Sequence, residues 1–425
     1  MVSALIIIVF VLGYIAIAFE HPLKLNKAAS ALITGVLCWT IYILQSQSAH
    51  TVTEELLHHL GEIASILFFL LGAMTIVELI DSHDGFDIIT QKIKSTNKAT
   101  LLLIITALTF FLSALLDNLT TAIVMTSLCT KILSEKEDRL WFAGMIVIAA
   151  NAGGAWSPLG DVTTTMLWIG GQITAINIMK QLILPSLVAC IFPALIVAYR
   201  FKGKKVASMP ESLCTVKEKR DGKIILFSGV GFLIFVPVFK TITHLPPFMG
   251  MLLALGLMWV ITTIIHKSKD HEIAERFTVA RALQKVDSPS ILFFLGILLA
   301  VSALQSFGLL KDLAGFLSSS LKNDFLIGIA LGLLSAIVDN VPLVAASQGM
   351  YDLTTYPTDH PFWEFLALTT GTGGSAVIIG TAAGVAVMGI EQIDFMWYLK
   401  KIGWLALIGF VAGILVFLLQ MKLTS

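Results

Sequence analysis

An aspartate followed by an asparagine occurs twice inside long apolar stretches of this chain. Asp117-Asn118 lies in Ser113-Ala-Leu-Leu-Asp-Asn-Leu-Thr-Thr-Ala, and Asp339-Asn340 lies in Ser335-Ala-Ile-Val-Asp-Asn-Val-Pro-Leu. A carboxylate at bilayer depth costs roughly 2.5 to 3.5 kcal/mol even on the insertion scale that penalises it least. Two such acids in matching surroundings indicate a function, and the sequence predicts that they belong to an ion site.

The composition restricts the class of protein. Of the 425 residues, 56% are hydrophobic and 13% are charged, which is too apolar for a water-soluble globule of this size. Apolar runs of membrane-spanning length recur from Leu5 to Gln420, so we expect an all-α membrane protein. The formal net charge is zero, which gives no electrostatic reason to expect nucleic acid as a partner.

We expect roughly ten transmembrane helices, two re-entrant helical hairpins and two interrupted helices. In the first half, the expected segments are 3–19, 28–45, 62–80, a hairpin of 100–116 and 119–133 with its tip at 117–118, 141–178 with a break at 151–161, and 182–199. After a cytoplasmic linker, 201–222, they are 223–240, 247–265, 290–307, a hairpin of 325–338 and 341–351 with its tip at 339–340, 362–390 with a break at 370–381, and 401–421.

Three motifs of the first half return in the second half in the same order. Ser65-Ile-Leu-Phe-Phe-Leu recurs from Ser290, the hairpin tip recurs 222 residues later, and Gly153-Gly154 recurs 220 residues later. Each half has five crossings and one hairpin, and five is an odd number. The sequence therefore predicts two repeats of inverted topology, 1–200 and 223–425, as in secondary transporters.

The positive charges give an independent test of the topology. If the linker is cytoplasmic, the loops on its side hold 23 of the 28 Lys and Arg residues. This satisfies the positive-inside rule. Both termini are then expected on the outer side, with the Asp117 hairpin entering from the cytoplasm and the Asp339 hairpin from the outer face.

The polar residues at the hairpin tips have two interpretations. Asp, Asn and Thr can cap helix ends that lie in lipid, and capping alone would explain them. For the aspartates we favour an ion site, because Ser or Asn would cap without the desolvation cost of a charge.

A second polar break follows the first hairpin, in Asn151-Ala-Gly-Gly-Ala-Trp-Ser-Pro-Leu-Gly-Asp161-Val-Thr163-Thr164. Gly and Pro would unwind the helix, and unwound backbone exposes the carbonyl oxygens that Na⁺ binds. The corresponding stretch around Gly373 has no acid, and Asp161 aligns with Thr381. The first half is therefore expected to hold the more charged site. Close helix packing through small residues is the alternative explanation for the glycines.

Our hypothesis is that Asp117, Asp161 and Asp339 carry protons and alkali cations by turns, because no Lys, Arg or His lies in the predicted interior of a span. The expected Na⁺ or Li⁺ ligands combine carboxylate, amide and hydroxyl oxygens from both halves. They are Ser113, Asp117, Asn118, Thr121, Asn151, Asp161, Thr163, Thr164, Ser335, Asp339, Asn340, Thr370, Thr372 and Ser375. Glu62, Glu78 and Glu364 lie at predicted span ends, where we expect their carboxylates to be solvated.

Four motifs of this sequence closely resemble the NhaD-type sodium/proton antiporters of the ion transporter superfamily. They are Phe19-Glu20-His21, Leu115 to Ala122, the polar break from Asn151 to Thr164, and Val338 to Pro342. The resemblance implies export of Na⁺ and Li⁺ in exchange for H⁺ across a bacterial cytoplasmic membrane, by a protein with inverted repeats that is commonly dimeric. It also implies functional roles for Ser113, Asp117, Asn118, Asn151, Asp161, Thr163, Thr164, Ser335, Asp339 and Asn340.

Three other functions stay open at this point. A Na⁺-coupled symporter or permease for a small dicarboxylate or oxyanion is the main alternative, although related anion symporters have a neutral Ser-Asn-Thr tip instead of Asp-Asn. An intramembrane aspartyl protease needs two carboxylates that face each other, and a passive channel does not need two opposed hairpins. We therefore expect a transporter rather than an enzyme, with no cofactor, and with the lipid bilayer, inorganic cations and a second copy of the chain as its partners.

Overall fold

The computed structural model describes residues 2–18, 20–46, 48–86, 88, 95–206, 216–267 and 277–424. Much of the predicted linker, and Phe19, therefore lie outside the described residues. The described chain is helical, apart from turns and a single β-bridge between Asn97 and Lys205. This confirms the expected all-α class.

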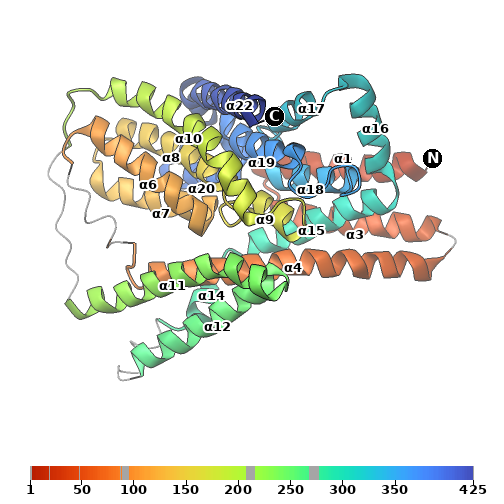
Figure 1. Ribbon diagram of the computed structural model, residues 1–425, viewed down its shortest axis with the longest axis horizontal. Helices are drawn as coiled ribbons and strands as arrows, with labels where there is room; N and C mark the ends of the chain where they lie inside the picture. Colours follow the sequence, from red (N-terminus) through yellow and green to blue (C-terminus); the bar gives the residue numbers. More distant parts are fainter. Residues whose placement is uncertain are drawn as a thin grey trace.

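The helices follow one another along both halves of the chain (Figure 1). In the first half they are α1 (Val2–Ala18), α2 (Glu20–Leu23), α3 (Lys27–Gln45), α4 (Ala49–Ser82), α6 (Lys98–Leu116), α7 (Asn118–Ile132), α8 (Lys136–Ala155), α9 (Val162–Ile169) and α10 (Ala175–Arg200). In the second half they are α11 (Val216–Thr243), α12 (Pro247–His266), α14 (Val279–Lys285), α15 (Ser288–Ser306), α16 (Leu309–Leu321), α17 (Asp324–Leu334), α18 (Asn340–Met350), α19 (Pro361–Gly373), α20 (Ala382–Glu391), α21 (Phe395–Tyr398) and α22 (Trp404–Thr424), with short 3₁₀ turns at Gly374–Ala376 and Ile378–Gly380 and a π-helical turn at Leu399–Gly403.

Many of these helices are long and apolar enough to cross a bilayer. Within the described residues there are 8, or 9 when α16 and α17, which bend by 115° at their junction, are taken as one span. The protein is therefore a multi-pass membrane protein. About ten crossings were expected, and the difference includes α1, whose 17 residues fall just below the usual spanning length.

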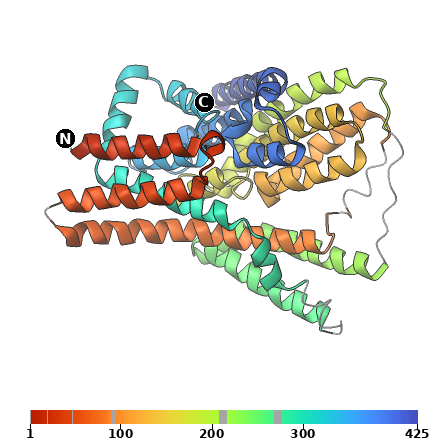
Figure 2. The ribbon, with the colours of Figure 1, turned by 180° about the vertical axis from the view of Figure 1, so that it is seen from behind.

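Two groups of helices pack around the long helix α4. Figure 2 shows α1, α3 and α4 side by side, and α15 lies against both α3 and α4. On another side, α11 and α12 pack on α4, whereas α6 to α10 and α17 to α22 form the rest of the molecule (Figure 1). The contact between α10 and α22 is close because Gly409 lies against the backbone of α10, where an added Cβ would be 2.2 Å from the Ala189 carbonyl oxygen.

Three boundaries differ from the prediction. Helix α4 begins at Ala49 rather than near residue 62, because its polar first turns, with Glu54, Glu55, His58 and His59, extend the helix ahead of the predicted apolar run. Helix α9 ends at Ile169, where Gly170 and Gly171 stop it with a positive φ of 81° at Gly171, and α10 begins at Ala175 rather than near 182. Helix α16 was not predicted.

Candidate ion-binding site

The first hairpin turns at Asp117, between α6 and α7. Asp117 has φ 77° and ψ 159°, a backbone conformation that a non-glycine residue rarely adopts. Its Oδ1 accepts a hydrogen bond from the Thr120 backbone N–H and its Oδ2 accepts one from the Thr120 hydroxyl, each at 2.8 Å. The carboxylate therefore caps α7 at the tip.

Asp161 has the same position relative to α9. The break between α8 and α9 covers Trp156 to Gly160, and Asp161 is the N-cap of α9. Its Oδ1 accepts hydrogen bonds from the backbone N–H and the hydroxyl of Thr163, both at 2.8 Å. Only 2% of Asp161 is exposed.

Both hairpin tips deliver an amide group to this one carboxylate. Asn118 Nδ2 donates to Asp161 Oδ2 at 2.5 Å, and Asn340 Nδ2 lies 3.3 Å from the same oxygen. Asn118 follows Asp117 and Asn340 follows Asp339, so each half supplies an equivalent residue. Asp161 is therefore one of the points where the two halves of the chain meet.

Asn151 on α8 extends this contact across the halves. Its Oδ1 accepts from Asn118 Nδ2 at 3.1 Å, and its Nδ2 donates to Ser375 Oγ at 2.9 Å and to Thr381 Oγ1 at 3.0 Å. We call the connected residues the polar network; they are Asn118, Asn151, Asp161, Thr163, Asn340, Ser375 and Thr381. All of them are buried.

The supports of the network occur in both halves. Ser113 Oγ donates to the Ala150 carbonyl at 2.6 Å, and Ser335 Oγ, 222 residues later, donates to the Thr370 carbonyl at 2.7 Å. These bonds fasten α6 to α8 and α17 to α19.

The glycines next to the network follow the same pattern. A Cβ on Gly153 would lie 2.2 Å from the Phe110 carbonyl oxygen, and one on Gly373 would lie 2.1 Å from the Gly332 carbonyl oxygen. The close helix packing weighed as an alternative is thus present, and it coexists with the polar break.

Some predicted ligands lie outside the polar network. Asp117 and Asp339 are half-buried N-caps, each one residue before the asparagine that bonds Asp161. The hydroxyls of three predicted threonines donate to carbonyls of their own segment: Thr164 to Asp161, Thr370 to Leu366 and Thr372 to Leu368. The Thr121 hydroxyl is buried and has no hydrogen-bond partner among the described residues.

The network offers carboxylate, amide and hydroxyl oxygens, which suit a hard cation. In the described part of the chain, no three His, Cys, Asp or Glu side chains lie close enough together to hold a metal ion. A cation at Asp161 would therefore be bound by one acid together with neutral oxygen ligands.

Sequence reasoning missed or misjudged three further residues. Thr381 belongs to the network, and its alignment with Asp161 was the signal that could have included it. Lys240 Nζ donates to the Trp168 carbonyl at the end of α9, at 2.9 Å, and lies 4.7 Å from the Trp168 ring centroid. Glu364 was expected to be solvated, but it is buried and accepts a hydrogen bond from Asn177.

Comparison with known proteins adds a family to this geometry. A family model described as "Citrate transporter" matches residues 14–371. The Na(+)/H(+) antiporter NhaD of Vibrio cholerae is 30% identical over 97% of this chain and 91% of its own length. The chain belongs to the NhaD antiporter family. NhaD of Alkalimonas amylolytica is also 30% identical, over 98% of this chain and 90% of its own length.

Relatives of this NhaD-family chain occur outside bacteria. Sodium/proton antiporter 1 of Arabidopsis thaliana is 46% identical over 97% of this chain and 71% of its own length. Among solved structures, MtrF of Neisseria gonorrhoeae, described as illuminating a class of antimetabolite efflux pumps, has a TM-score of 0.50 at 12% identity and covers 98% of this chain and 94% of its own. That likeness concerns the fold alone.

Proposed function

We propose that this NhaD-family protein is a secondary active antiporter that exports Na⁺ or Li⁺ in exchange for protons by alternating access. The observation that carries the proposal is the pair of asparagines, one from each hairpin tip, that donate to the buried carboxylate of Asp161. The names of its relatives, which include sodium/proton antiporters of bacteria and of a plant, support the same exchange.

The asparagines explain how one site can accept two kinds of cation. An amide has two donor hydrogens on nitrogen and an acceptor oxygen. In the present arrangement both Nδ2 groups face the carboxylate, which suits an ionised Asp161. When Na⁺ binds, a half-turn of each amide brings Oδ1 to the ion. When a proton binds, the carboxyl group is neutral, and no amide oxygen has to turn toward it.

The proposal includes an orientation in the membrane. The halves would be inverted repeats, so that one hairpin opens toward the cytoplasm and the other toward the outside. The equivalent supports made by Ser113 and Ser335 are consistent with a repeat. The membrane would be the bacterial cytoplasmic membrane, with both termini on its outer side, in accordance with the distribution of Lys and Arg.

Transport of a small anion is the function to be distinguished, since the matching family model is described as a citrate transporter. An anion needs a positively charged or donor-rich site. In the described structure, the groups that bond Asp161 are amides, a hydroxyl and a backbone N–H, none of which is positively charged. The carboxylate already takes up these donors, so an anion would be repelled.

The test uses the whole protein in proteoliposomes with an acidic interior and an acridine dye. We expect Na⁺ or Li⁺ to cause dequenching with the unmodified protein and with Asp352→Asn, a change of an exposed loop acid. Asp161→Asn, which keeps the shape and removes the charge, should abolish the response. Full exchange by Asp161→Asn, or Na⁺-dependent uptake of labelled citrate or succinate without dequenching, would overturn the proposal.

A further inference from the structure

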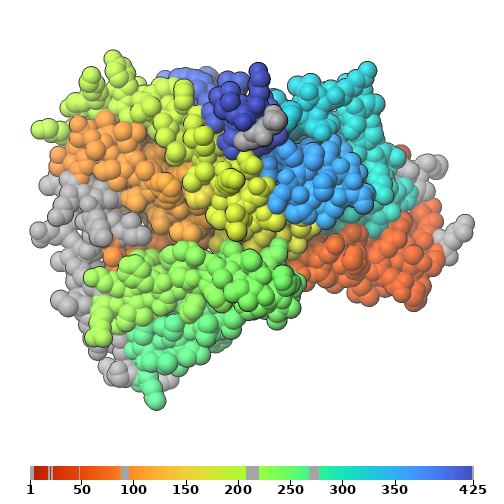
Figure 3. Space-filling model, in the orientation of Figure 1, coloured from red at the N-terminus to blue at the C-terminus, as the bar shows by residue number. Residues whose placement is uncertain are grey.

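A polar cavity of 460 Å³ lies between two pairs of helices, with α4 and α15 on one side and α9 and α18 on the other. Figure 3 shows α9 (yellow) and α18 (blue) next to each other on one face, with α11 (green) below them. The walls hold charged and amide groups as well as apolar ones. Those of polar character are His59, Glu62, Ser65, Gln172, Ser302, Gln305 and Gln348.

The inner end of the cavity lies close to the polar network. It reaches Met166 on α9 and Ala345 on α18. Each of these residues lies five positions after a network residue, Asp161 or Asn340, and an α-helix rises about 1.5 Å per residue. The cavity therefore ends within roughly 8 Å, along the helix axes, of the buried carboxylate.

Its outer end is at the edge of the hydrocarbon layer. Helix α4 has 34 residues, which gives a length of about 50 Å against about 30 Å for the hydrocarbon core. The first 14 of them, Ala49 to Glu62, contain the charged residues of this end. Glu62 is thus placed where the apolar part of α4 begins.

Two histidines hold the Glu62 carboxylate at the rim. His58 Nε2 lies 3.6 Å from Oε1, and His59 Nδ1 lies 3.3 Å from Oε2, while His59 Nε2 is 3.2 Å from the Ser306 hydroxyl. The Glu62 side chain is still 62% exposed. It is therefore positioned by its neighbours but open to water.

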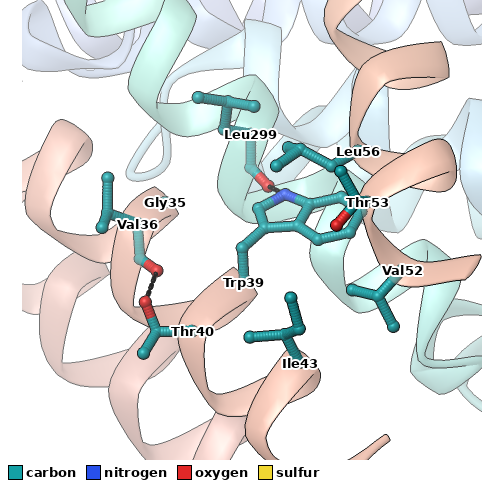
Figure 4. A pocket seen from close by; sticks show the side chains of 9 residues that line it. All are labelled: Gly35, Val36, Trp39, Thr40, Ile43, Val52, Thr53, Leu56 and Leu299. Carbon is teal, nitrogen blue, oxygen red and sulfur yellow. Dashed lines mark hydrogen bonds between the residues drawn. The ribbon is translucent and has the colours of Figure 1, made fainter. Parts of the chain in front are cut away.

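A second cavity has a different character. It lies between α3, α4 and α15 and is lined mainly by Val36, Trp39, Ile43, Val52 and Leu56, with the Trp39 indole donating to the Leu299 carbonyl (Figure 4). Its walls offer no carboxylate. Of these two cavities, the polar one is suited to a cation.

We propose that the polar cavity is the outer passage to the polar network, and that Glu62 at its rim is a transient binding site for an alkali cation. A hydrated ion fits, because the cavity is more than ten times larger than the roughly 30 Å³ that one water occupies in the liquid. The negative charge raises the local concentration of Na⁺ or Li⁺ at the mouth. This inference rests on the proposed exchange function.

The chain provides a matched control in Glu54, which lies on the same helix. Its Oε2 is 3.5 Å from His50 Nδ1, also four residues away, and its side chain is 68% exposed. Glu54 does not line the polar cavity. Glu62→Gln and Glu54→Gln therefore remove the same charge from the same kind of pair, inside and outside the cavity.

The first experiment measures Na⁺ dependence from each face, in right-side-out and everted vesicles. We expect Glu62→Gln to raise the apparent KM for Na⁺ at the outer face about two- to fivefold without changing kcat, and to have no effect at the cytoplasmic face. The shift should shrink as ionic strength rises, because salt screens an exposed charge. Equal behaviour of the Glu62 and Glu54 variants would overturn the role of Glu62.

The second experiment tests the passage itself. Ala345→Cys and Ser302→Cys place a thiol on opposite walls, and the three described native cysteines are buried. A membrane-impermeant, positively charged thiol reagent should block exchange by these variants from the outer face and leave the unmodified protein active. If neither thiol reacts from that face while exchange continues, the cavity is not the passage. Loss of exchange in Asp161→Asn would still support the proposed function in that case. The two proposals can therefore fail separately.

Discussion

At the scale of single residues, the structure separates two kinds of acid that look alike in the sequence. Asp161 is fully enclosed and receives amide groups from both halves. Asp117 and Asp339 are less buried and bond mainly to the first turn of the following helix. The sequence shows that all three acids lie in apolar segments. It does not show which of them the asparagines contact.

Substitution of Asp117 distinguishes its capping role from a role as a charge carrier. Asp117→Asn keeps an oxygen that can accept from the Thr120 N–H, so its melting temperature should stay near that of the unmodified protein. If the charge is needed, its exchange rate falls at least about tenfold, which corresponds to about 1.4 kcal/mol. Asp117→Ala should also lose about 1 kcal/mol of stability through loss of the cap.

Dye dequenching and thermal unfolding in detergent measure the two effects separately. Unimpaired exchange by Asp117→Asn would show that Asp117 serves only as the N-cap of α7.

At the scale of elements, the hairpins and broken helices depend on backbone contacts that leave no room for a side chain. Gly153 on α8 lies against α6, and Gly373 on α19 lies against α17. The breaks predicted at 151–161 and 370–381 include these glycines, and the helices end at Ala155 and at Gly373. Gly153 therefore permits close approach inside α8, whereas Gly373 permits close approach at the end of α19.

Alanine at either position should weaken the fold. The added Cβ meets a backbone carbonyl at 2.2 Å for Gly153→Ala and 2.1 Å for Gly373→Ala, so the paired helices must separate. Overpacking of this kind costs about 1 to 3 kcal/mol, and both variants should unfold at lower temperature. Gly389→Ala on α20 is the control, because its Cβ would have no neighbour within 4 Å. A similar melting temperature for all three variants would contradict the role of close approach.

At the scale of the whole molecule, an ion pair joins the two halves away from the polar network. Arg139 on α8 donates from Nε to Glu391 Oε2 on α20 at 3.1 Å, and the Glu391 side chain is only 2% exposed. Removal of one partner from a buried pair leaves an uncompensated charge, which costs about 3 kcal/mol.

We expect Arg139→Met to lower the melting temperature and Arg139→Met with Glu391→Gln to recover most of the loss. Arg200→Met breaks an exposed pair with Glu137 and should change little. If Arg139→Met unfolds at the same temperature as the unmodified protein, this pair does not hold the halves together.

The sequence predicted the class, most helix positions and the polar tips, because apolar run length and polar interruptions are local signals. It placed Asn340 and Asp161 in one ion site, but it did not predict that the amide of one bonds the carboxylate of the other, and it did not predict the contact of Lys240 with Trp168. The segment predicted for α4 was also too short, because the polar first turns of this helix do not resemble a membrane span. Individual hydrogen bonds between the halves depend on the packed fold, and no local pattern encodes them.

The meeting of Asn118 and Asn340 at one carboxylate has a consequence for leakage. An exchanger dissipates the ion gradient whenever it reorients with nothing bound. Because an amide from each half is bonded to Asp161, a bare negative charge there holds both tips in place at once. In the proposed exchange, a bound proton or metal ion neutralises that charge, so this single acid would make reorientation depend on a bound cation.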